Sequence, residues 1–444
     1  MEKKSSCSLG IYLLSLCVLI VGAWIGWYLQ RLPSSPVRGH RPLASGSMAT
    51  AEPGPHFKIR CHDCRMTYLC DVTTVSAENS PVCFNCGATN SIEGLPGHTH
   101  QVAYEAGPIQ RWSKVVFQSS GTPPEQTMML KRVVGMPNES IQIDHGELWI
   151  NRRIYQKSIE EFDRFRIPVF DSRYRPQDTR FSFLKRFAVA PNEQGWIITS
   201  TGEFAFDDDE KRAPQWLEYI HWNAIPGFVP KVPRGMPTAI FDYQPYNQYI
   251  SRPQLHFVDD YVVDVAISTR SVPAFWLRLQ DVEIEINLEA KTVIAYQGAH
   301  VCGSHSLTVD GLNPAAPFQL RVGRLDQRIV IQVKSETIYF DFTPIRPSGH
   351  FEEDELLRQR PFAIGAAAGY LDVQSILIAR DIYWLNPQGQ DDFWEFAGEI
   401  PPATFFVAGD NQPVSEDSRH WQHGVSQSAI HGIVVESGLE RGYE

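Results

Sequence analysis

The residues that could do chemistry begin with Lys131, a lysine set in an apolar run. Its apolar neighbours are Met128, Met129, Leu130, Val133 and Val134. A lysine on an apolar strand can lie at a sheet edge with its charged head in water. A buried lysine can instead lose its proton and act as a general base. The run by itself leaves both interpretations open.

Two serine segments lie far from this lysine in the sequence: Ser45-Gly46-Ser47-Met48 and Ser415-Glu416-Asp417-Ser418-Arg419. Alone, Ser-Gly-Ser is typical of a linker. A serine hydroxyl is a weak nucleophile and needs a neighbour to take its proton. A lysine with the ordinary pKa of about 10.4 is neutral in only about one molecule in 2,500 at pH 7, whereas a pKa of ~8 makes roughly a tenth neutral. Desolvation in an apolar strand supplies that change, so the setting of Lys131 suits a base.

Read together and in order, three segments resemble the type I signal peptidases, which are membrane-anchored Ser/Lys proteases. The segments are the one around Ser47, Lys131-Arg-Val-Val-Gly-Met-Pro137, and Gly409-Asp410-Asn411 with the Ser415 segment. The resemblance implies that Ser47 is the nucleophile and Lys131 the general base. It also implies that the Ser45 hydroxyl and the Ser47 amide form the oxyanion hole, and that Ser415 orients the lysine.

The same resemblance implies that Asp417 and Arg419 form a structural ion pair and that Asp410 and Asn411 are structural residues near the site. It implies an endopeptidase that removes signal peptides from preproteins without a catalytic cofactor. The substrate would bind extended, as an added strand, with small residues before the cleaved bond. The implied location is the cytoplasmic membrane, with the catalytic domain on the extracytoplasmic side.

Two motif positions depart from the family pattern. The family has Pro-Thr-Leu shortly after Ser-Met, where this chain has Ala49-Thr50-Ala51. The family has Asn-Arg-Asp after Gly-Asp, where this chain has Asn411-Gln412-Pro413. The first change touches the segment that would line the substrate groove, so it bears on specificity more than on the Ser/Lys pair.

Four cysteines are spaced as two Cys-x-x-Cys pairs, Cys61 with Cys64 and Cys83 with Cys86. This spacing is typical of a four-cysteine zinc ribbon, and it predicts a structural zinc ion. Two disulfides are the alternative in an oxidising compartment. A zinc ion with four thiolate ligands has no open position, so the predicted role is structural or substrate-contacting.

The chain begins with a long uncharged segment. Residues 9–29 are almost wholly apolar and would span roughly 31 Å as a helix, about the thickness of a bilayer core. We expect a retained transmembrane anchor, because the apolar run is longer than that of a cleaved signal peptide. Basic residues flank both sides, so charge does not give the orientation.

Length, charge and strand patterns set the remaining expectations. The 444 residues predict two or three domains, and the net charge of −11 argues against nucleic acid as a partner. Short alternating strands between residues 261 and 384 predict a β-sandwich. They loosely resemble a concanavalin- or laminin-G-like jelly roll, which implies a possible glycan or protein ligand.

The predicted fold class is therefore mainly β, with a signal-peptidase-like core, one N-terminal transmembrane helix, a small zinc ribbon and an inserted jelly-roll sandwich. The predicted divisions are an anchor at 1–31, a linker and nucleophile segment at 32–60, the zinc-ribbon insert at 61–93, core with the lysine at 94–155, a polar connecting insert at 156–240, the sandwich at 241–390 and the C-terminal part of the core at 391–444.

Two functions remain open from the sequence. The first is a membrane-anchored signal peptidase that uses a Ser/Lys dyad. The second is a degenerate peptidase that binds a surface glycan or protein through its sandwich, and the altered motif residues motivate it.

Overall fold

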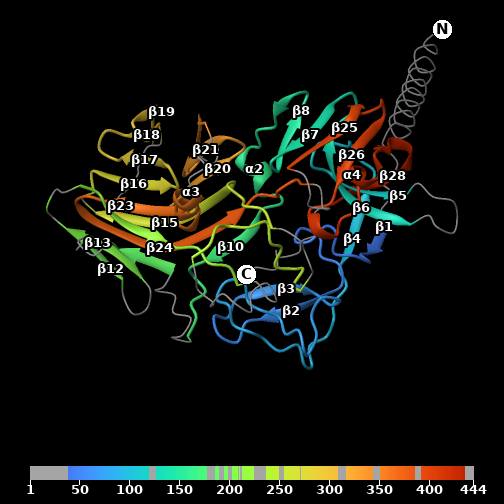
Figure 1. Cartoon of the computed structure of the whole chain (residues 1–444), viewed down its shortest axis with the longest axis horizontal. Coiled ribbons are helices and arrows are strands. Elements are labelled where there is room, and N and C mark those ends of the chain that lie inside the picture. Colours follow the sequence, from blue (N-terminus) through green and yellow to red (C-terminus); the bar gives the residue numbers. More distant parts are fainter. Residues whose placement is uncertain are drawn as a thin grey trace, which may run out of the picture.

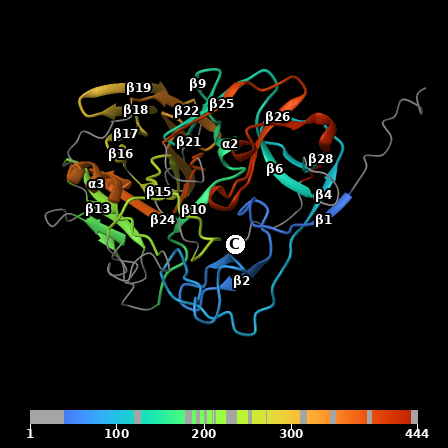
Figure 2. The ribbon, with the colours of Figure 1, turned by 45° about the vertical axis from the view of Figure 1, so that its right-hand side comes forward.

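The computed structural model describes residues 39–119, 127–177, 186–189, 195–198, 203–208, 210, 213–224, 237–249, 255–270, 272–308, 317–343, 351–385 and 392–435. Two β-rich halves lie side by side, with a small cysteine-containing lobe against both of them (Figure 1). The turned view in Figure 2 shows the same arrangement.

The first half contains a seven-stranded sheet that joins distant parts of the chain. Its order is β1 (Gly39–Pro42), β4 (Gln101–Glu105), β28 (Ile430–Val434), β5 (Lys114–Gln118), β6 (Met128–Gly135), β26 (Thr404–Ala408) and β27 (Val425–Ser426). Every pairing is antiparallel. The last strands of the chain therefore flank the strands nearest the lysine, and the intervening residues form an insertion.

A second sheet extends this half. It comprises β25 (Phe393–Glu399), β7 (Ser140–Asp144), β8 (Glu147–Ile150) and β9 (Arg153–Ile154). The alternation expected for β7 and β8 is confirmed, because Ile141, Ile143, Leu148 and Ile150 are all buried. They pack with Trp112, Trp384 and Phe406, which ties this sheet to the seven-stranded sheet and to the insertion.

The insertion folds as a sandwich of two antiparallel sheets. One sheet has the order β12 (Trp196–Ile198), β13 (Phe204–Asp208), β24 (Gly369–Arg380), β15 (Tyr261–Arg270), β20 (Phe318–Leu325), β21 (Arg328–Val333) and β22 (Glu336–Asp341), with β10 (Ile167–Asp171) also paired to β24. The other has β11 (Phe187–Val189), β14 (Gln215–Tyr219), β23 (Phe362–Ala366), β16 (Ala274–Leu279), β17 (Val282–Asn287), β18 (Thr292–Gln297) and β19 (His300–Ser306). One large apolar core lies between them.

The segment at 156–240 differs from the expected polar connection. Strands β10 to β14 come from it and belong to the two sandwich sheets. Phe187, Phe204 and Tyr219 from these strands pack in the sandwich core. These strands are three to five residues long, too short to give a clear alternating pattern in a polar segment.

The helical part of the described chain is small. It comprises α2 (Ile159–Phe162), α3 (Phe351–Gln359), α4 (Ser418–Trp421) and the 3₁₀ turns η3 (Gln412–Val414) and η4 (Gln427–Ala429). This small helical content agrees with the predicted mainly β fold class. The transmembrane helix in that prediction is not supported. None of the helices in the described ranges is long and apolar enough to cross a bilayer, and the predicted span at 9–29 lies outside those ranges.

Candidate active site

Lys131 lies in the middle of β6, between β5 and β26. Val115 of β5 is its register partner, and residues two apart on a strand share a face, so Lys131 faces the same way as Met129 and Val133. Its side chain is 2% exposed, which excludes the edge-charge interpretation. Burial is the main cause that lowers the pKa of Lys131 to about 8, and the nearby Asp417 carboxylate opposes it.

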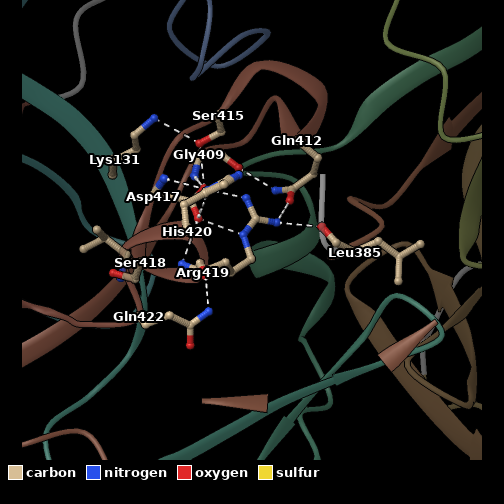
Figure 3. A network of polar contacts seen from close by, with 11 residues as sticks. Lys131, Leu385, Gly409, Gln412, Ser415, Asp417, Ser418, Arg419, His420 and Gln422 are labelled. Carbon is tan, nitrogen blue, oxygen red and sulfur yellow. Dashed lines mark hydrogen bonds and ion pairs between the residues drawn. The ribbon is translucent and has the colours of Figure 1, made fainter. Parts of the chain in front are cut away.

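The amine of Lys131 donates a hydrogen bond to Ser415 Oγ at 3.0 Å (Figure 3). The Ser415 hydroxyl in turn donates to Asp417 Oδ2 at 2.6 Å. This chain of bonds fixes the direction of the lysine with a neutral group next to it. A charged acceptor in direct contact would favour the protonated amine instead.

Asp417 is held ionised by its own partners. Burial alone would raise its pKa, but the Arg419 guanidinium and the bonds from Ser415 and the Gly409 amide lower the pKa to about 2. Arg419 Nε donates to Asp417 Oδ1 at 2.7 Å, and Arg419 Nη2 donates to Asp417 Oδ2. The ion pair predicted at Asp417 and Arg419 is present and buried.

Ser47 lies on the loop before the cysteine lobe and is 8% exposed. Its hydroxyl oxygen accepts a bond from Ser45 Oγ at 3.4 Å. The Asn411 amide donates to the Ser47 carbonyl at 3.0 Å, and the Asn411 side chain donates to the Gly46 carbonyl at 2.8 Å. The turn after β26 therefore holds the backbone on both sides of the serine.

Gly409 lies where the loop that carries Ser47 meets the segment that carries Ser415. A Cβ at this position would lie 2.3 Å from Ser415 Oγ and 2.5 Å from the Ser47 carbonyl oxygen. Only glycine allows this approach. Gly409 therefore lies between Ser47 and Ser415, the hydrogen-bond partner of Lys131, but within the described residues Lys131 and Ser47 make no hydrogen bond to each other. Their catalytic roles, and the oxyanion role of Ser45, stay predictions.

Asp410 has a partner that sequence reasoning missed. Arg132, next to the lysine, donates to both carboxylate oxygens of Asp410 at 2.7 and 2.6 Å, and both residues are buried. Arg132 also donates to the Trp112 carbonyl at 2.9 Å. The pair links β6 to the end of β26. The sequence did offer a signal for this pair: Arg132 stands next to a lysine in an apolar run, and Asp410 follows soon after the apolar strand β26.

The altered Asn411-Gln412-Pro413 segment is well integrated in the turn. Gln412 Nε2 donates to the Gly409 carbonyl at 2.5 Å, and Gln412 Oε1 accepts from Arg419. Gln412 is 6% exposed. The departure from the family pattern therefore occurs together with its own set of bonds around Arg419.

Two residues between the sandwich strands β14 and β15 brace the loop that carries Ser47. Tyr246 packs so closely on Gly46 that a Cβ there would lie 2.4 Å from its ring, and its hydroxyl donates to the Pro55 carbonyl at 2.9 Å. Asn247 accepts from Asn411 Nδ2 at 2.8 Å. This brace was not predicted, because its contacts join residues far apart in the sequence and carry no periodic signal.

For the peptide cleavage that the sequence predicts, we expect Asn247→Ala to lower kcat by roughly tenfold with little change in KM, because Asn411 then loses the partner that aligns the Ser47 backbone. The variant should also lose about 1–3 kcal/mol of stability from the unpaired Asn411 side chain. Steady-state kinetics and thermal melts measure both effects. Asn247→Asp keeps the acceptor oxygen and should restore part of kcat, and Asn79→Ala at an exposed turn is the control. Full activity in Asn247→Ala would contradict the bracing role.

The four cysteines of the two pairs come together in the lobe formed by β2 (His56–Arg60) and β3 (Thr67–Asp71). All four sulfurs lie within 4.8 Å of one another and are buried. The sulfurs of Cys61 and Cys86 are 3.5 Å apart, and those of Cys64 and Cys83 are 3.6 Å apart. A disulfide requires about 2.05 Å, whereas a tetrahedral zinc with bonds of about 2.3 Å places its sulfurs about 3.8 Å apart. Gly87 has φ +79°, as a knuckle turn requires.

Comparison with known proteins gives one family match. Residues 93–197 match the family model described as signal peptidase, peptidase S26. The match includes Lys131 and supports a signal peptidase domain in this chain, although it leaves out Ser47 and Ser415. No curated protein matches the chain.

Solved structures resemble the chain only weakly. A carbohydrate binding module CBM66 from Bacillus subtilis is 9% identical, covers 43% of this chain and 92% of its own, and has a TM-score of 0.26. A protein of unknown function with a galectin-like fold, also from Bacillus subtilis, is 8% identical, covers 48% of this chain and 97% of its own, and has a TM-score of 0.29. The Caenorhabditis elegans galectin LEC-6 is 13% identical, with 27% and 83% coverage and a TM-score of 0.20.

Proposed function

We propose that this protein is a serine endopeptidase of the signal peptidase type, which cleaves signal peptides from preproteins with a Ser47/Lys131 dyad. The observation that carries the proposal is the setting of Lys131: a buried amine with a pKa of about 8, directed by Ser415 and its ionised partner Asp417. A lysine that only stabilised the fold would not need this arrangement. The family match at residues 93–197 supports the same conclusion.

In the proposed reaction, Ser47 Oγ attacks the carbonyl carbon of the scissile bond. The neutral amine of Lys131 takes the hydroxyl proton and later gives it to the leaving amine, which leaves the signal peptide joined to Ser47 as an ester. Water, deprotonated by Lys131, then hydrolyses this ester and restores the Ser47 hydroxyl. The negative oxygen of the intermediate is stabilised by the Ser47 amide and the Ser45 hydroxyl. Ser45 and Ser47 already lie 3.4 Å apart between their hydroxyl oxygens. A small rotation of the Ser45 hydroxyl redirects its proton from Ser47 to the substrate.

The proposed substrates are the signal peptides of preproteins, bound as an extended strand with small residues before the cleaved bond. The matched family is typically associated with membranes, and such substrates occur at membrane surfaces. The Ala49 segment that departs from the family pattern is buried beside Leu69 and Tyr246. Any change of specificity is therefore expected to involve the cysteine lobe and the brace as well.

We also propose that Cys61, Cys64, Cys83 and Cys86 hold a structural zinc ion. The supporting observations are the four buried sulfurs at near-tetrahedral spacing and the knuckle conformation of Gly87. The zinc would crosslink the lobe. It would have no open position for substrate.

Purified protein and the Ser47→Ala variant, incubated with a preprotein, test the proposed activity. We expect the parent to release the mature protein and the variant to lose at least about 10³-fold in rate, because the attacking oxygen is gone. Ser304→Ala, on the exposed edge strand β19, is the matched control and should cleave normally. Equal cleavage by Ser47→Ala and the parent would exclude the dyad. Absence of cleavage by the parent would favour the degenerate-peptidase alternative.

A further inference from the structure

Arg186 is a buried arginine at the boundary between the sandwich and the cysteine lobe. It directly precedes β11, at the end of one sandwich sheet, and its carbonyl accepts from the Ile220 amide at 2.7 Å. The residue is 1% exposed. Its guanidinium contacts the lobe, because Nη2 donates to the carbonyl of Asn85 at 3.0 Å. Asn85 lies inside the second cysteine pair, between Cys83 and Cys86.

Asn85 also joins the lobe to the sandwich through its side chain. The side-chain amide donates to the carbonyl of Asp171, at the end of β10, at 3.2 Å and to that of Tyr174 at 2.9 Å. The side-chain oxygen accepts from the Asp171 amide at 2.9 Å. Arg186 therefore contacts the cysteine pair at the point where this pair is fixed to the sandwich.

The positive charge of Arg186 has no acidic partner. A guanidinium stays protonated inside a protein. Nη1 donates to the Tyr219 hydroxyl at 3.1 Å, and Cζ lies 3.6 Å from the centre of the Trp222 ring. Burial raises the pKa of Tyr219 to about 12, so this hydroxyl is neutral. Within the described residues no carboxylate pairs with Arg186, and Asp171 pairs with Arg173 instead.

A buried charge without an opposite charge nearby is costly, so Arg186 requires an anion. Burial lowers the pKa of Arg186, and Tyr219 opposes this effect. Cys86 and Cys83 oppose it too, so their sulfurs lie close enough to act on the charge of the guanidinium. Two disulfides or four thiols carry no charge. Four thiolates around one zinc ion carry a net charge of about −2, which is the anion that Arg186 requires.

We infer that Arg186 is the counter-charge of the four-cysteine zinc site, and that the bound ion thereby fastens the sandwich to the cysteine lobe. This role rests on the zinc site proposed above and adds a residue outside the four ligands. Arg186 does not bind the ion; it acts through its charge and through its bond to Asn85, so it is a positioning residue. Because the attraction exists only when the ion is bound, zinc binding and the contact between lobe and sandwich stabilise each other.

The zinc affinity of the full-length protein tests this role without a protease assay. Reduced protein is titrated with ZnCl₂ in competition with a chromogenic chelator, for the parent, Arg186→Met and Arg186→Lys. Methionine can pack against Trp222 but has no charge, so we expect zinc affinity to fall roughly 10- to 100-fold, as it does when other residues that support metal ligands are changed. Lysine keeps the charge, so Arg186→Lys should bind zinc more tightly than Arg186→Met.

Thermal stability separates this role from simple packing. In zinc-free protein, Arg186→Met should raise the Tm or leave it unchanged, because it removes a buried charge that has no partner. In zinc-loaded protein, the same substitution should lower the Tm, because the site then loses its counter-charge. A residue needed only for packing would lower the Tm equally in both states, and that result would overturn the inference.

Arg324→Met is the matched control. Arg324 is also buried in the sandwich, and its Cζ lies 4.7 Å from the centre of the Phe342 ring, but it pairs with Asp281 at 2.9 Å. This variant should bind zinc as the parent does. A parent that binds no zinc would contradict the zinc site itself, and the role of Arg186 with it. A parent that binds zinc no more tightly than Arg186→Met would overturn only the role of Arg186. Equally weak binding in both Arg186 variants would also overturn that role, because the charge would then not matter.

Discussion

Lys131→Met will abolish preprotein cleavage, lowering kcat/KM by about 10⁴-fold or more, while the protein stays folded. Methionine matches the apolar surroundings of this position in β6 but cannot accept a proton. Removing one member of a nucleophile–base pair costs about as much as removing the whole unit. The measurement is single-turnover cleavage of a preprotein, with Lys58→Met on the exposed face of β2 as the matched control.

Stability distinguishes loss of the base from loss of the fold. The free lysine in the unfolded chain binds its proton up to about pH 10.5, whereas the folded protein releases it near pH 8. Between these values the unfolded state holds more protons, so the stability of the parent rises with pH. At neutral pH the free energy of unfolding is therefore about 3 kcal/mol lower than it would be with an unshifted lysine at this position. Methionine removes that cost, and Ser415 keeps its bond to Asp417. Lys131→Met should therefore melt at the same temperature as the parent or higher at pH 7.

The pH dependence of the parent follows from the same group. kcat/KM should rise with pH through about 8, because roughly a tenth of Lys131 is neutral at pH 7 and about half at pH 8. A profile that is flat between pH 6 and pH 9 would mean that Lys131 is not the titrating base. Normal cleavage by Lys131→Met would mean the same.

Cys61→Ser will abolish binding of the proposed zinc ion and unfold the cysteine lobe. Structural zinc supplies about 10–16 kcal/mol to small domains of this kind, and three remaining thiolates hold the ion poorly. Elemental analysis should find about one zinc per chain in the parent and far less in the variant. Cys70→Ser is the control, because Cys70 is equally buried in β3 but is not among the four converging sulfurs. It should retain its zinc.

Loss of zinc should also reduce cleavage, because the lobe supports the nucleophile loop. The Asp71 amide donates to the Tyr246 carbonyl at 3.0 Å, and Leu69 packs with Ala49 and Tyr246. A chelator is therefore expected to lower kcat even though the proposed Ser/Lys mechanism uses no metal. An intact mass lower by four protons, with no zinc present, would instead establish two disulfides and contradict the metal site.

The candidate site residues could be predicted from the sequence, but most of the residues that hold them in place could not. Lys131 and the paired cysteines stood out because a charged residue in an apolar run and a fixed Cys-x-x-Cys spacing are local patterns. The bonds from Asn411 to Asn247 and from Arg132 to Asp410 span 164 and 278 residues. Contacts between residues so far apart depend on which strands pair with one another. Neither periodicity nor composition indicates that pairing.

The fold shows the same division. Strands β7 and β8 were predictable because alternating Ile and Leu residues mark their buried face. Strand β11 was not, since three residues cannot establish a period and its pairing with β14 depends on the rest of the sandwich. The sequence also did not indicate that Gln412 would contact both Gly409 and Arg419 in place of the family residues.

The late position of β26 has a consequence for how this protein is made. The base and its orienting serine are 284 residues apart, which corresponds to roughly 15 to 60 s of ribosomal synthesis at about 5–20 residues per second. Until β26 pairs with β6, one flank of the lysine strand is open to water, and the amine keeps its proton. In the proposed mechanism, a nascent chain therefore carries Ser47 for most of its synthesis without a neutral Lys131, and the site becomes complete only after β26 has paired with β6.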